Sequence, residues 1–315
     1  MKVLFQGAGA IGIAAAALVA DAHGVAVAGR TPVSGSRAAY PRRLGRFQPN
    51  ARTASDVHGD RQGRIRAEAA STRRVPVTDF AGARAAGAWD LIVLSTRPGD
   101  LDPEVASAIR RIGPRHIAIT SQVEGDLDRA RTEFPAAEVV VFAPLFLSER
   151  VEAGAAPSGR EVRYWAPIGA PRFLLAGRAA AVRRLSRGLG RLVLPVPMSA
   201  VVVPPAVFIP YVAELNIRGG DWAGLRSHLH RPTQAAAEAV RSRLGLPVPT
   251  SALIARFVLA ALERIVPIDV TSYAGRHFAR HRGQTRDMLA GWAESERSTA
   301  LHAQIAELDR ARTGR

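Results

Sequence analysis

The pattern of hydrophobic and polar positions divides the chain into two halves that predict different architectures. In the first half, short apolar runs alternate with helical segments, which is typical of a parallel sheet covered by helices. Beyond Met198, apolar residues recur with helical spacing and the strand-like runs stop. The pattern predicts an α/β fold, with a doubly wound Rossmann domain over residues 1–199 followed by an all-α domain over residues 200–315.

The individual elements follow this division. In the first half we expect strands at residues 2–6, 24–29, 75–77, 90–95, 116–120, 138–142 and 192–196, and helices at 103–112, 128–133 and 178–189. Residues 162–176 predict a hairpin-like pair of strands. Residues 32–74 are rich in Arg, Gly, Ser and Pro and predict a loop-rich insertion, with a weak helix at 62–70. In the second half we expect helices at 206–217, 232–244, 250–264, 273–280, 285–294 and 299–311.

A glycine motif follows the first predicted strand and opens the first helix. It reads Gly7-Ala8-Gly9-Ala10-Ile11-Gly12. In this context the first glycine allows a tight turn, the second leaves room for a pyrophosphate, and the third lets the helix pack on the sheet. The helix N-terminus then offers unpaired N–H groups to phosphates. The motif predicts a dinucleotide site with contacts from Gly7, Gly9, Ala10, Ile11 and Gly12; an incidental glycine turn is the alternative.

The end of the second strand indicates which dinucleotide binds. An NAD site usually has an acidic residue here for the ribose 2′-hydroxyl, whereas this chain has Arg30-Thr31. A guanidinium can pair with a 2′-phosphate, and the Thr31 hydroxyl can add a hydrogen bond, so NADP(H) is the predicted cofactor. A solvated arginine at a strand end is the alternative. Thr96, Arg97 and Gln122 follow later strands and are further candidate cofactor contacts.

Composition narrows the function classes. The net charge is +16, but Lys2 is the only lysine among 43 basic residues, and the arginines are spread along the chain. We therefore expect no nucleic-acid partner, although the charge alone would suggest one. The absence of cysteine excludes disulfides and thiolate chemistry. No apolar run of membrane-spanning length is expected, and the chain enters a strand directly after Met1, so we predict a cytoplasmic protein with no membrane partner.

Several of these features together resemble the ketopantoate reductase family, which shares its type of C-terminal domain with 6-phosphogluconate dehydrogenase. They are the glycine motif, Arg30, a basic residue after the fourth strand in the element Asp90-Leu91-Ile92-Val93-Leu94-Ser95-Thr96-Arg97, and the all-helical second half. His277-Phe278 and the segment 284–289 add to the resemblance, which covers essentially the whole chain. It implies hydride transfer from NADPH to a carbonyl or imine of a small molecule in the cleft between the domains, and a homodimer.

The resemblance also names catalytic positions, and several of them differ. The family places a lysine four residues before an asparagine; Asn216 matches the asparagine, but Val212 stands at the lysine position. The family's Gln-Asn-Gly reads Gln122-Val123-Glu124, and its Ser…Glu pair reads Ser272 and Gln284. The resemblance therefore implies Asn216, Ser272 and Gln284 as catalytic-site residues, with a substrate other than ketopantoate.

The residues themselves leave alternatives open. Asn216 could simply end a helix, and Ser272 could cap one. Other groups in the helical half that could donate a proton are Tyr211, Glu214, Tyr273, His277 and His281. No Asp, Glu or His spacing predicts a metal site. Besides an NADPH-dependent reductase, the sequence allows a non-redox cyclase or isomerase on the same scaffold, or an NADP(H)-binding sensor or structural protein.

Overall fold

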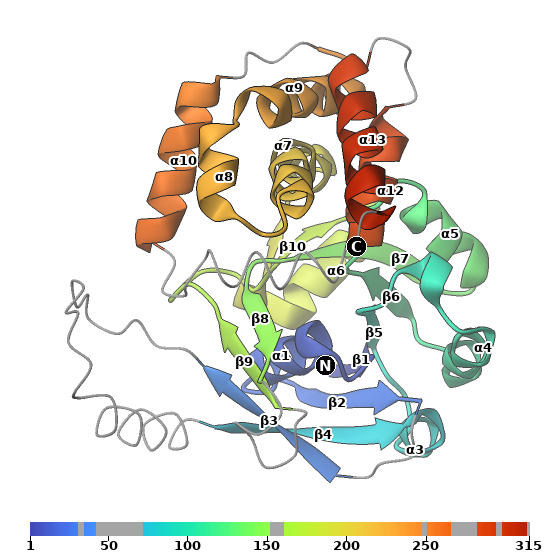
Figure 1. Ribbon diagram of the computed structural model, residues 1–315. Helices are drawn as coiled ribbons and strands as arrows, with labels where there is room; N and C mark the ends of the chain where they lie inside the picture. Colours follow the sequence, from blue (N-terminus) through green and yellow to red (C-terminus); the bar gives the residue numbers. More distant parts are fainter. Residues whose placement is uncertain are drawn as a thin grey trace, which may run out of the picture. The chain divides into compact units, whose positions relative to one another are not determined.

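The computed structural model describes residues 1–30, 35–41, 72–151, 161–246, 251–265, 282–293 and 298–313. The chain divides into two compact units (Figure 1). The first unit contains residues Met1–Ser121 and Gly125–Val196, and the second contains Gln122–Glu124 and Pro197–Arg315. The first is α/β and the second is helical, as the hydrophobic pattern predicts.

The centre of the first unit is a parallel sheet with the strand order of a Rossmann domain. Its six strands run in the order β4-β2-β1-β5-β6-β7 and are all parallel to their neighbours. Their bounds are β1 Lys2–Gln6, β2 Gly24–Gly29, β4 Arg73–Asp79, β5 Leu91–Leu94, β6 His116–Ile119 and β7 Glu138–Pro144. The order reverses between β1 and β5, and ligands of such sheets bind outside the carboxyl ends of the strands at this point.

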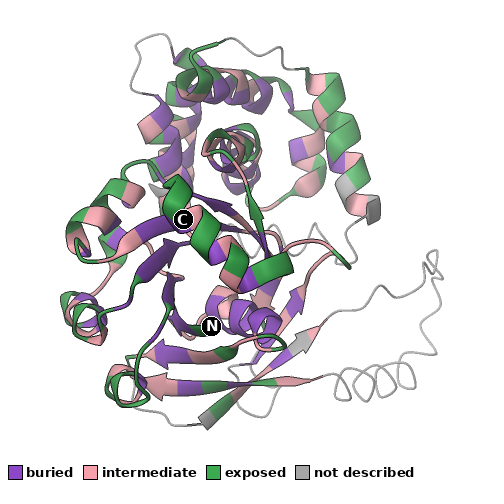
Figure 2. Cartoon of the chain, turned by 180° about the vertical axis from the view of Figure 1, so that it is seen from behind, coloured by how far each residue is buried: buried purple, intermediate pink, exposed green. Residues whose placement is uncertain are grey.

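The helices of this unit connect the parallel strands. They are α1 (Ala10–Val19), α3 (Phe80–Ala85), α4 (Pro103–Ile112), α5 (Asp126–Glu133) and α6 (Ala179–Leu189), with short 3₁₀ turns at Pro98–Asp100 and Gly190–Leu192. Half of the residues of helix α1 are alanine, and the helix is buried along nearly its whole length (Figure 2). Because its side chains are small, it packs closely against β1, β2 and β4 on one face of the sheet.

Further strands extend the sheet at both ends, so that the described residues form one mixed sheet of eleven strands. Strands β3 (Gly35–Pro41), β9 (Val162–Trp165) and β8 (Leu147–Arg150) lie beyond β4, and β10 (Phe173–Ala176) and β11 (Val193–Pro195) lie beyond β7. The hairpin predicted within 162–176 is therefore wrong. Strand β9 pairs with β3 and β8, whereas β10 pairs with β7 and β11, because long-range partners outcompete the local one.

Part of the predicted insertion also proves to be regular structure. Residues Gly35–Pro41 form β3, which pairs with β4 and β9. Their sequence, GSRAAYP, has little strand propensity, so only the pairing partners reveal the strand. The weak helix at 62–70 and the helix at 273–280 lie outside the described residues. The helix predicted at 103–112 is confirmed as α4, whereas α3 and β8 were not expected.

The second unit is built around one long helix. Helix α7 (Ser199–Ile217) is surrounded by α8 (Trp222–Ser227), α9 (His230–Leu244), α12 (Arg282–Trp292) and α13 (Thr299–Thr313), and α10 (Ala252–Ile265) packs against α9 (Figure 1). The apolar core consists mainly of alanine and leucine side chains from α7, α9, α12 and α13, together with Met288 and Trp292. Helix α7 contains Pro204, Pro205 and Pro210, and it begins at Ser199, before the start of the helix predicted at 206–217.

Helix α7 is the one helix in the described part of the chain that is long and apolar enough to cross a membrane. The sequence predicted no apolar segment long enough to span a membrane, and the 19 residues of α7 reach that length. The core helix of a protein that never meets a membrane passes the same test, and α7 contributes Ala206 and Ala213 to the apolar core of its unit. The absence of a membrane partner stays a prediction.

Candidate functional site

The three glycines of the motif have different structural roles. Gly7 has φ +92°, and a Cβ there would lie 2.7 Å from Ser95 Oγ. A Cβ at Gly12 would overlap the carbonyl oxygen of Gly7, so the third glycine allows α1 to approach the loop. At Gly9 nothing lies within 4 Å of a Cβ position. Gly7 and Gly12 are thus required by the fold, whereas Gly9 faces open space.

The N-terminus of α1 opens directly at this loop. Gly9 is its N-cap residue and has no side chain to accept hydrogen bonds from the first turn. The first turn contains no acidic residue. The N–H groups of the first turn and the positive end of the helix dipole are therefore not offset by the helix's own side chains, which suits an anionic group.

A reciprocal hydrogen bond ties the ends of β1 and β5 together beside the loop. Gln6 Nε2 donates to Thr96 Oγ1 at 3.1 Å, and the backbone N–H of Thr96 donates to Gln6 Oε1 at 3.3 Å. Ser95 Oγ donates to the carbonyl oxygen of Gln6 at 2.6 Å. These bonds fix the loop after β1 against the loop after β5, at the point where the strand order reverses.

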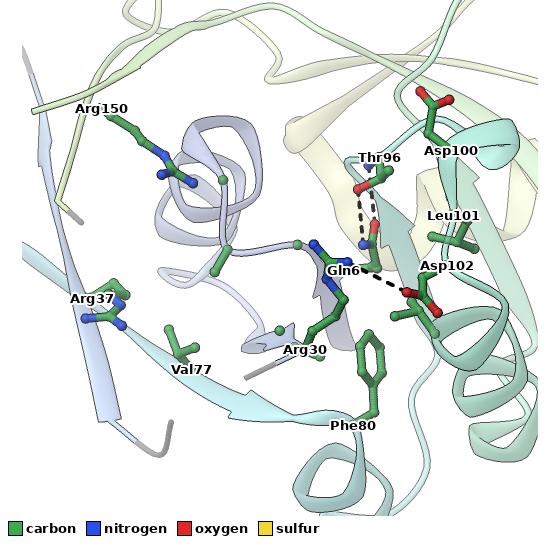
Figure 3. A pocket seen from close by; sticks show the side chains of 16 residues that line it. Gln6, Arg30, Arg37, Val77, Phe80, Thr96, Asp100, Leu101, Asp102 and Arg150 are labelled. Atoms are coloured by element: carbon green, nitrogen blue, oxygen red, sulfur yellow. Dashed lines mark hydrogen bonds and ion pairs between the residues drawn. The ribbon is translucent and has the colours of Figure 1, made fainter. Parts of the chain in front are cut away.

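A cavity of about 510 Å³ lies at this reversal point (Figure 3). Ligand pockets usually measure about 300–1,000 Å³. All the residues that line the cavity belong to the first unit and come from its strands, its loops and the first turns of α3 and α4. They are Gln6, Gly7, Ala8, Gly9, Ala28, Gly29, Arg30, Arg37, Val77, Phe80, Thr96, Asp100, Leu101, Asp102, Val105 and Arg150. Four of the predicted cofactor residues therefore lie together: Gly7, Gly9, Arg30 and Thr96.

The cavity contains an apolar part and a charged part. Phe80, Leu101 and Val105 offer apolar surface near the ends of β4 and β5. Arg30 follows β2, is 77% exposed, and its Nη1 lies 3.7 Å from Asp102 Oδ2. Asp102 also accepts a hydrogen bond from the N–H of Glu104 as the N-cap of α4. This wall has both signs of charge.

Sequence reasoning missed several cavity residues. Gln6 stands next to the glycine motif, and its position at the end of the first strand is a signal that could have been used. Arg37 and Arg150 lie on β3 and β8, which the hydrophobic pattern did not predict. Phe80 is the first residue of α3, and Asp102 directly precedes α4. Nothing in the neighbouring sequence connects either residue to the glycine loop.

Three other predicted cofactor residues, Ala10, Ile11 and Arg97, lie elsewhere in the first unit. Ala10 and Ile11 belong to the first turn of α1, and Thr31 lies outside the described residues. Arg97 does not line the cavity; its Nε lies 3.2 Å from Asp126 Oδ2. Asp126 is buried and accepts a second hydrogen bond from Ser121 Oγ. Arg97 thus connects the loop after β5 to the start of α5, and a cofactor contact stays a prediction.

Residues Gln122–Glu124, which lie shortly after β6 in the sequence, belong to the helical unit. Gln122 is half-buried, and Val123 is buried in the apolar core of this unit. Glu124 Oε1 lies 2.7 Å from Arg243 Nη1. The two positions that differ from the reductase motif therefore have structural partners here: the valine packs in the core and the glutamate forms an ion pair.

The catalytic candidates are also on the helical unit. Asn216 lies near the end of α7 and is 3% exposed. Its backbone carbonyl oxygen accepts a hydrogen bond from Arg282 Nη2 at 2.7 Å. Its side-chain amide nitrogen, Nδ2, has no hydrogen-bond partner among the described residues. Gln284 is half-buried on α12. Ser272 lies outside the described residues, as do Tyr273, His277 and His281.

Two further proton-donor candidates have other partners. Glu214 is fully buried, with Arg218 Nε at 2.8 Å and Arg231 Nε at 2.9 Å from its carboxylate oxygens. It therefore acts as the centre of a buried ion cluster. Tyr211 Oη lies 2.9 Å from Thr233 Oγ1, and burial raises the pKa of Tyr211 above its usual value. Within the described ranges, no cluster of three or more His, Asp or Glu side chains could hold a metal ion.

The strand order, the glycine loop and the cavity at the reversal point define a Rossmann domain of the dinucleotide-binding type. The comparisons with solved structures narrow the fold further. The chain is similar to a dimeric ketopantoate reductase from Staphylococcus aureus, with 11% identity, a TM-score of 0.66, and 100% of this chain and 99% of that chain covered. A probable 2-dehydropantoate 2-reductase from Bacillus subtilis matches with 13% identity, a TM-score of 0.61, and 99% and 100% covered.

A D-mandelate dehydrogenase, described as a complex with NADH, matches with 10% identity, a TM-score of 0.59, and 100% and 99% covered. No protein-family model and no curated protein sequence matches the chain. The chain therefore has the ketopantoate reductase fold, an N-terminal Rossmann domain followed by a helical domain, which confirms the predicted fold class.

Proposed function

We propose that this chain is an NADPH-dependent reductase that reduces a carbonyl or imine group of a small molecule. The observation that supports this most directly is the cavity at the glycine loop, which combines an open helix N-terminus with arginine side chains. The neighbours in fold are described as reductases and a dehydrogenase, and one of them binds NADH, so a nicotinamide cofactor suits the scaffold. Because such neighbours include an NADH enzyme, the preference for NADPH rests on the arginines of this chain.

The residues present fit a dinucleotide. Gly9 leaves the space that a pyrophosphate needs, and the N–H groups of the first turn of α1 would bind it. Phe80, Leu101 and Val105 would contact the adenine ring, and arginines would bind the extra phosphate. When bound, the cofactor supplies the hydride; the protein contributes binding, orientation and electrostatics.

Asn216 is the residue that we propose to orient the reacting group. Its amide nitrogen is buried, and leaving such a donor unpaired costs roughly 1–3 kcal/mol. A buried donor without a partner calls for a physical explanation, and a bound ligand is one such explanation. A carbonyl oxygen or imine nitrogen of a substrate would accept this hydrogen bond. Ser272 and Gln284 complete the proposed substrate site.

We propose that the substrate is not ketopantoate. Val212 provides no proton donor at the lysine position of the family, and Val123 is committed to the apolar core. Glu214 lies two residues before Asn216, but its carboxylate is fully enclosed by arginines and the helix core. The proton would therefore have to come from water, from the substrate itself, or from a group outside the described residues.

The test uses the purified full-length chain. NADPH and NADH are titrated by fluorescence, and loss of the reduced-nicotinamide absorbance is followed with a panel of 2-oxo acids and imines that includes ketopantoate. We expect tighter binding of NADPH and oxidation by at least one substrate other than ketopantoate. Binding without oxidation would instead favour the non-redox cyclase or isomerase or the sensor, and binding of neither cofactor would refute the proposal.

Asn216→Ala separates catalysis from cofactor binding. We expect kcat to fall by about 10- to 100-fold, the loss of one hydrogen bond to a developing charge, while the Kd for NADPH is unchanged. Circular dichroism controls for folding. An unchanged kcat would show that Asn216 only ends the helix.

We also propose a homodimer that forms through α10. Four apolar side chains on one stripe of this helix are between 40% and 68% exposed: Leu253, Ile254, Phe257 and Val258. A neighbour in fold is described as dimeric. Sedimentation of the wild type as a dimer and of Phe257→Glu as a monomer would support this interface, and a monomeric wild type would contradict it.

A further inference from the structure

Two arginines of the cavity have no assigned role. Arg37 is on β3 and Arg150 is the last residue of β8, and both line the cavity at the glycine loop. We propose that Arg37 and Arg150 together bind the 2′-phosphate of NADPH and give the site most of its preference for NADPH over NADH. This inference rests on the proposed function and identifies the residues that determine its cofactor specificity.

The first argument is the absence of competing partners. Within the described part of the chain, neither Arg37 nor Arg150 has a hydrogen-bond or ion-pair partner. Arginines on the neighbouring strand differ: Arg73 Nη1 lies 2.6 Å from Asp21 Oδ2, and Arg74 Nη1 donates to Ser36 Oγ at 3.4 Å. The two cavity guanidiniums therefore keep their donors for a ligand, and a phosphate is the group whose geometry matches theirs.

The second argument is the distribution of charge across the cavity. Figure 3 shows Arg37 and Arg150 on the side away from Asp100 and Asp102, with Arg30 between the two groups. Arg30 is already paired with Asp102. A phosphate is repelled by the side with the carboxylates and attracted by the side with the unpaired guanidiniums, so the two unpaired arginines are the better phosphate ligands.

The third argument is how the fold brings these residues to the glycine loop. Strands β3, β8 and β9 pack against α1, whose N-terminus receives the pyrophosphate in the proposed site. Side chains alternate along a strand, so Arg37 points to the same face as Ala39, which packs with α1 in the apolar core. Likewise Arg150 shares a face with Ser148, which is buried. Both guanidiniums thus extend from the covered face of the sheet into the cavity.

The test uses two competitors beside NADPH and NADH. They are adenosine 2′,5′-bisphosphate and adenosine 5′-monophosphate, which differ only in the 2′-phosphate. In the full-length chain, Arg37→Gln or Arg150→Gln should each weaken NADPH and the 2′,5′-bisphosphate by about 10-fold, and the double variant by about 100-fold. The affinities for NADH and the 5′-monophosphate should change less than about threefold. Arg74→Gln is the matched control, an exposed arginine on β4 outside the cavity, and should change nothing.

The outcomes separate this inference from the proposed function. A double variant that folds and keeps the wild-type preference for NADPH would overturn the inference and leave the proposed function standing. Equal weakening of all four ligands would also overturn it, because the arginines would then contact the pyrophosphate. If the double variant does not fold, the preference for NADPH over NADH is compared between the wild type and the two single variants. A wild type that binds none of the four ligands refutes the proposed function itself.

Discussion

Arg30 Nη1 lies 3.7 Å from Asp102 Oδ2, which links the residue after β2 to the residue that caps α4. Both residues line the cavity that the glycine loop also lines (Figure 3). Arg30 is 77% exposed and Asp102 is 38% exposed, so water screens the pair and its net stabilisation is small. The pair therefore affects the charge that a ligand meets more than it affects the stability of the fold.

Removing the charge of Asp102 should strengthen NADPH binding. Asp102→Asn keeps a residue that caps helices well but frees Arg30 and removes a carboxylate from the cavity. The interaction free energy of an exposed ion pair of this kind is about 0.2–1 kcal/mol. We therefore expect the affinity for NADPH to rise by about two- to fivefold at low salt. Titration of NADPH at several ionic strengths checks this. Weaker binding would mean that Asp102 itself contacts the cofactor, through the ribose hydroxyls.

Arg30→Ala tests the assignment made from the sequence. If Arg30 contributes to 2′-phosphate binding, the variant should lose about three- to tenfold in NADPH affinity and much less in NADH affinity, because only NADPH has the extra phosphate. The measurement is the ratio of the two Kd values. Equal losses for both cofactors would remove Arg30 from the phosphate site.

Much of the fold could be predicted because the relevant signals are local. The buried strands β1, β5 and β6 are short apolar runs, and α4 has a proline at its first turn and Gly113 with φ +66° at its end. Strands β3, β8 and β9 carry mixed sequences whose strand conformation depends on pairing with distant segments. Local patterns contain no information on such pairing, which is why the hairpin at 162–176 was predicted wrongly.

The candidate site divides in the same way. The glycine motif and Arg30 can be recognised from the sequence because each directly follows a predicted apolar strand. Arg37 and Arg150 are 113 positions apart and meet in one cavity only because β3 and β8 both pack on α1. On the helical unit, Glu214 could be suspected as an acid from its position, but its enclosure by Arg218 and Arg231 depends on packing between α7 and α9.

The glycines of the motif should respond differently to alanine. In Gly12→Ala the new Cβ overlaps the backbone carbonyl of Gly7, so either the loop or α1 must move. Overpacking of this kind costs about 1–3 kcal/mol, and the Tm should fall together with cofactor affinity. In Gly9→Ala the Cβ enters open space, so the stability should fall by no more than about 1 kcal/mol, the effect of alanine at an N-cap.

Gly9→Ala should reduce the affinity for both cofactors while leaving the stability of the protein nearly unchanged. A Cβ at this position occupies the space proposed for the pyrophosphate, so NADPH and NADH should both weaken by about 10-fold or more, since a methyl group there blocks hydrogen bonds to a charged group. Thermal unfolding and titration on the same preparation measure the two effects. Unchanged affinity for both cofactors would exclude the loop as the pyrophosphate site.

Glu214 should be essential for the stability of the helical unit. Glu214→Gln leaves Arg218 and Arg231 partly buried without their counter-charge, and breaking a buried pair costs about 3–5 kcal/mol. A fall in Tm of roughly 10 °C is expected. Glu307→Gln is the matched control: this side chain is 33% exposed and lies 3.8 Å from Arg231, so its loss should change stability by no more than about 1 kcal/mol.

His116 should make the protein less stable in mild acid. It is buried at the start of β6, where Nδ1 donates to the carbonyl oxygen of Asp90 and Nε2 accepts from Arg184 Nη1. This arrangement needs the neutral ring. Burial lowers the pKa of His116 below 6.5, the positive charges of Arg184 and Arg115 lower it further, and the hydrogen bond to Asp90 and the charge of Glu138 oppose the shift.

The sign of the pH dependence follows from this shift. Between the lowered pKa of the folded state and 6.5, the unfolded chain binds more protons at His116, so stability decreases as the pH falls through this range and is complete above it. His116→Gln should reduce the slope of unfolding free energy against pH by up to about 1.4 kcal/mol per pH unit in this window. Burial also lowers the pKa of His23, so the unfolded chain binds a second proton there in this pH range. His116→Gln should therefore retain part of the slope, and the double variant His116→Gln, His23→Gln should lose it. Denaturant unfolding of the wild type and both variants at pH values below and above 6.5 measures this. A slope in His116→Gln equal to that of the wild type would show that the pKa of His116 is the same in the folded and unfolded states.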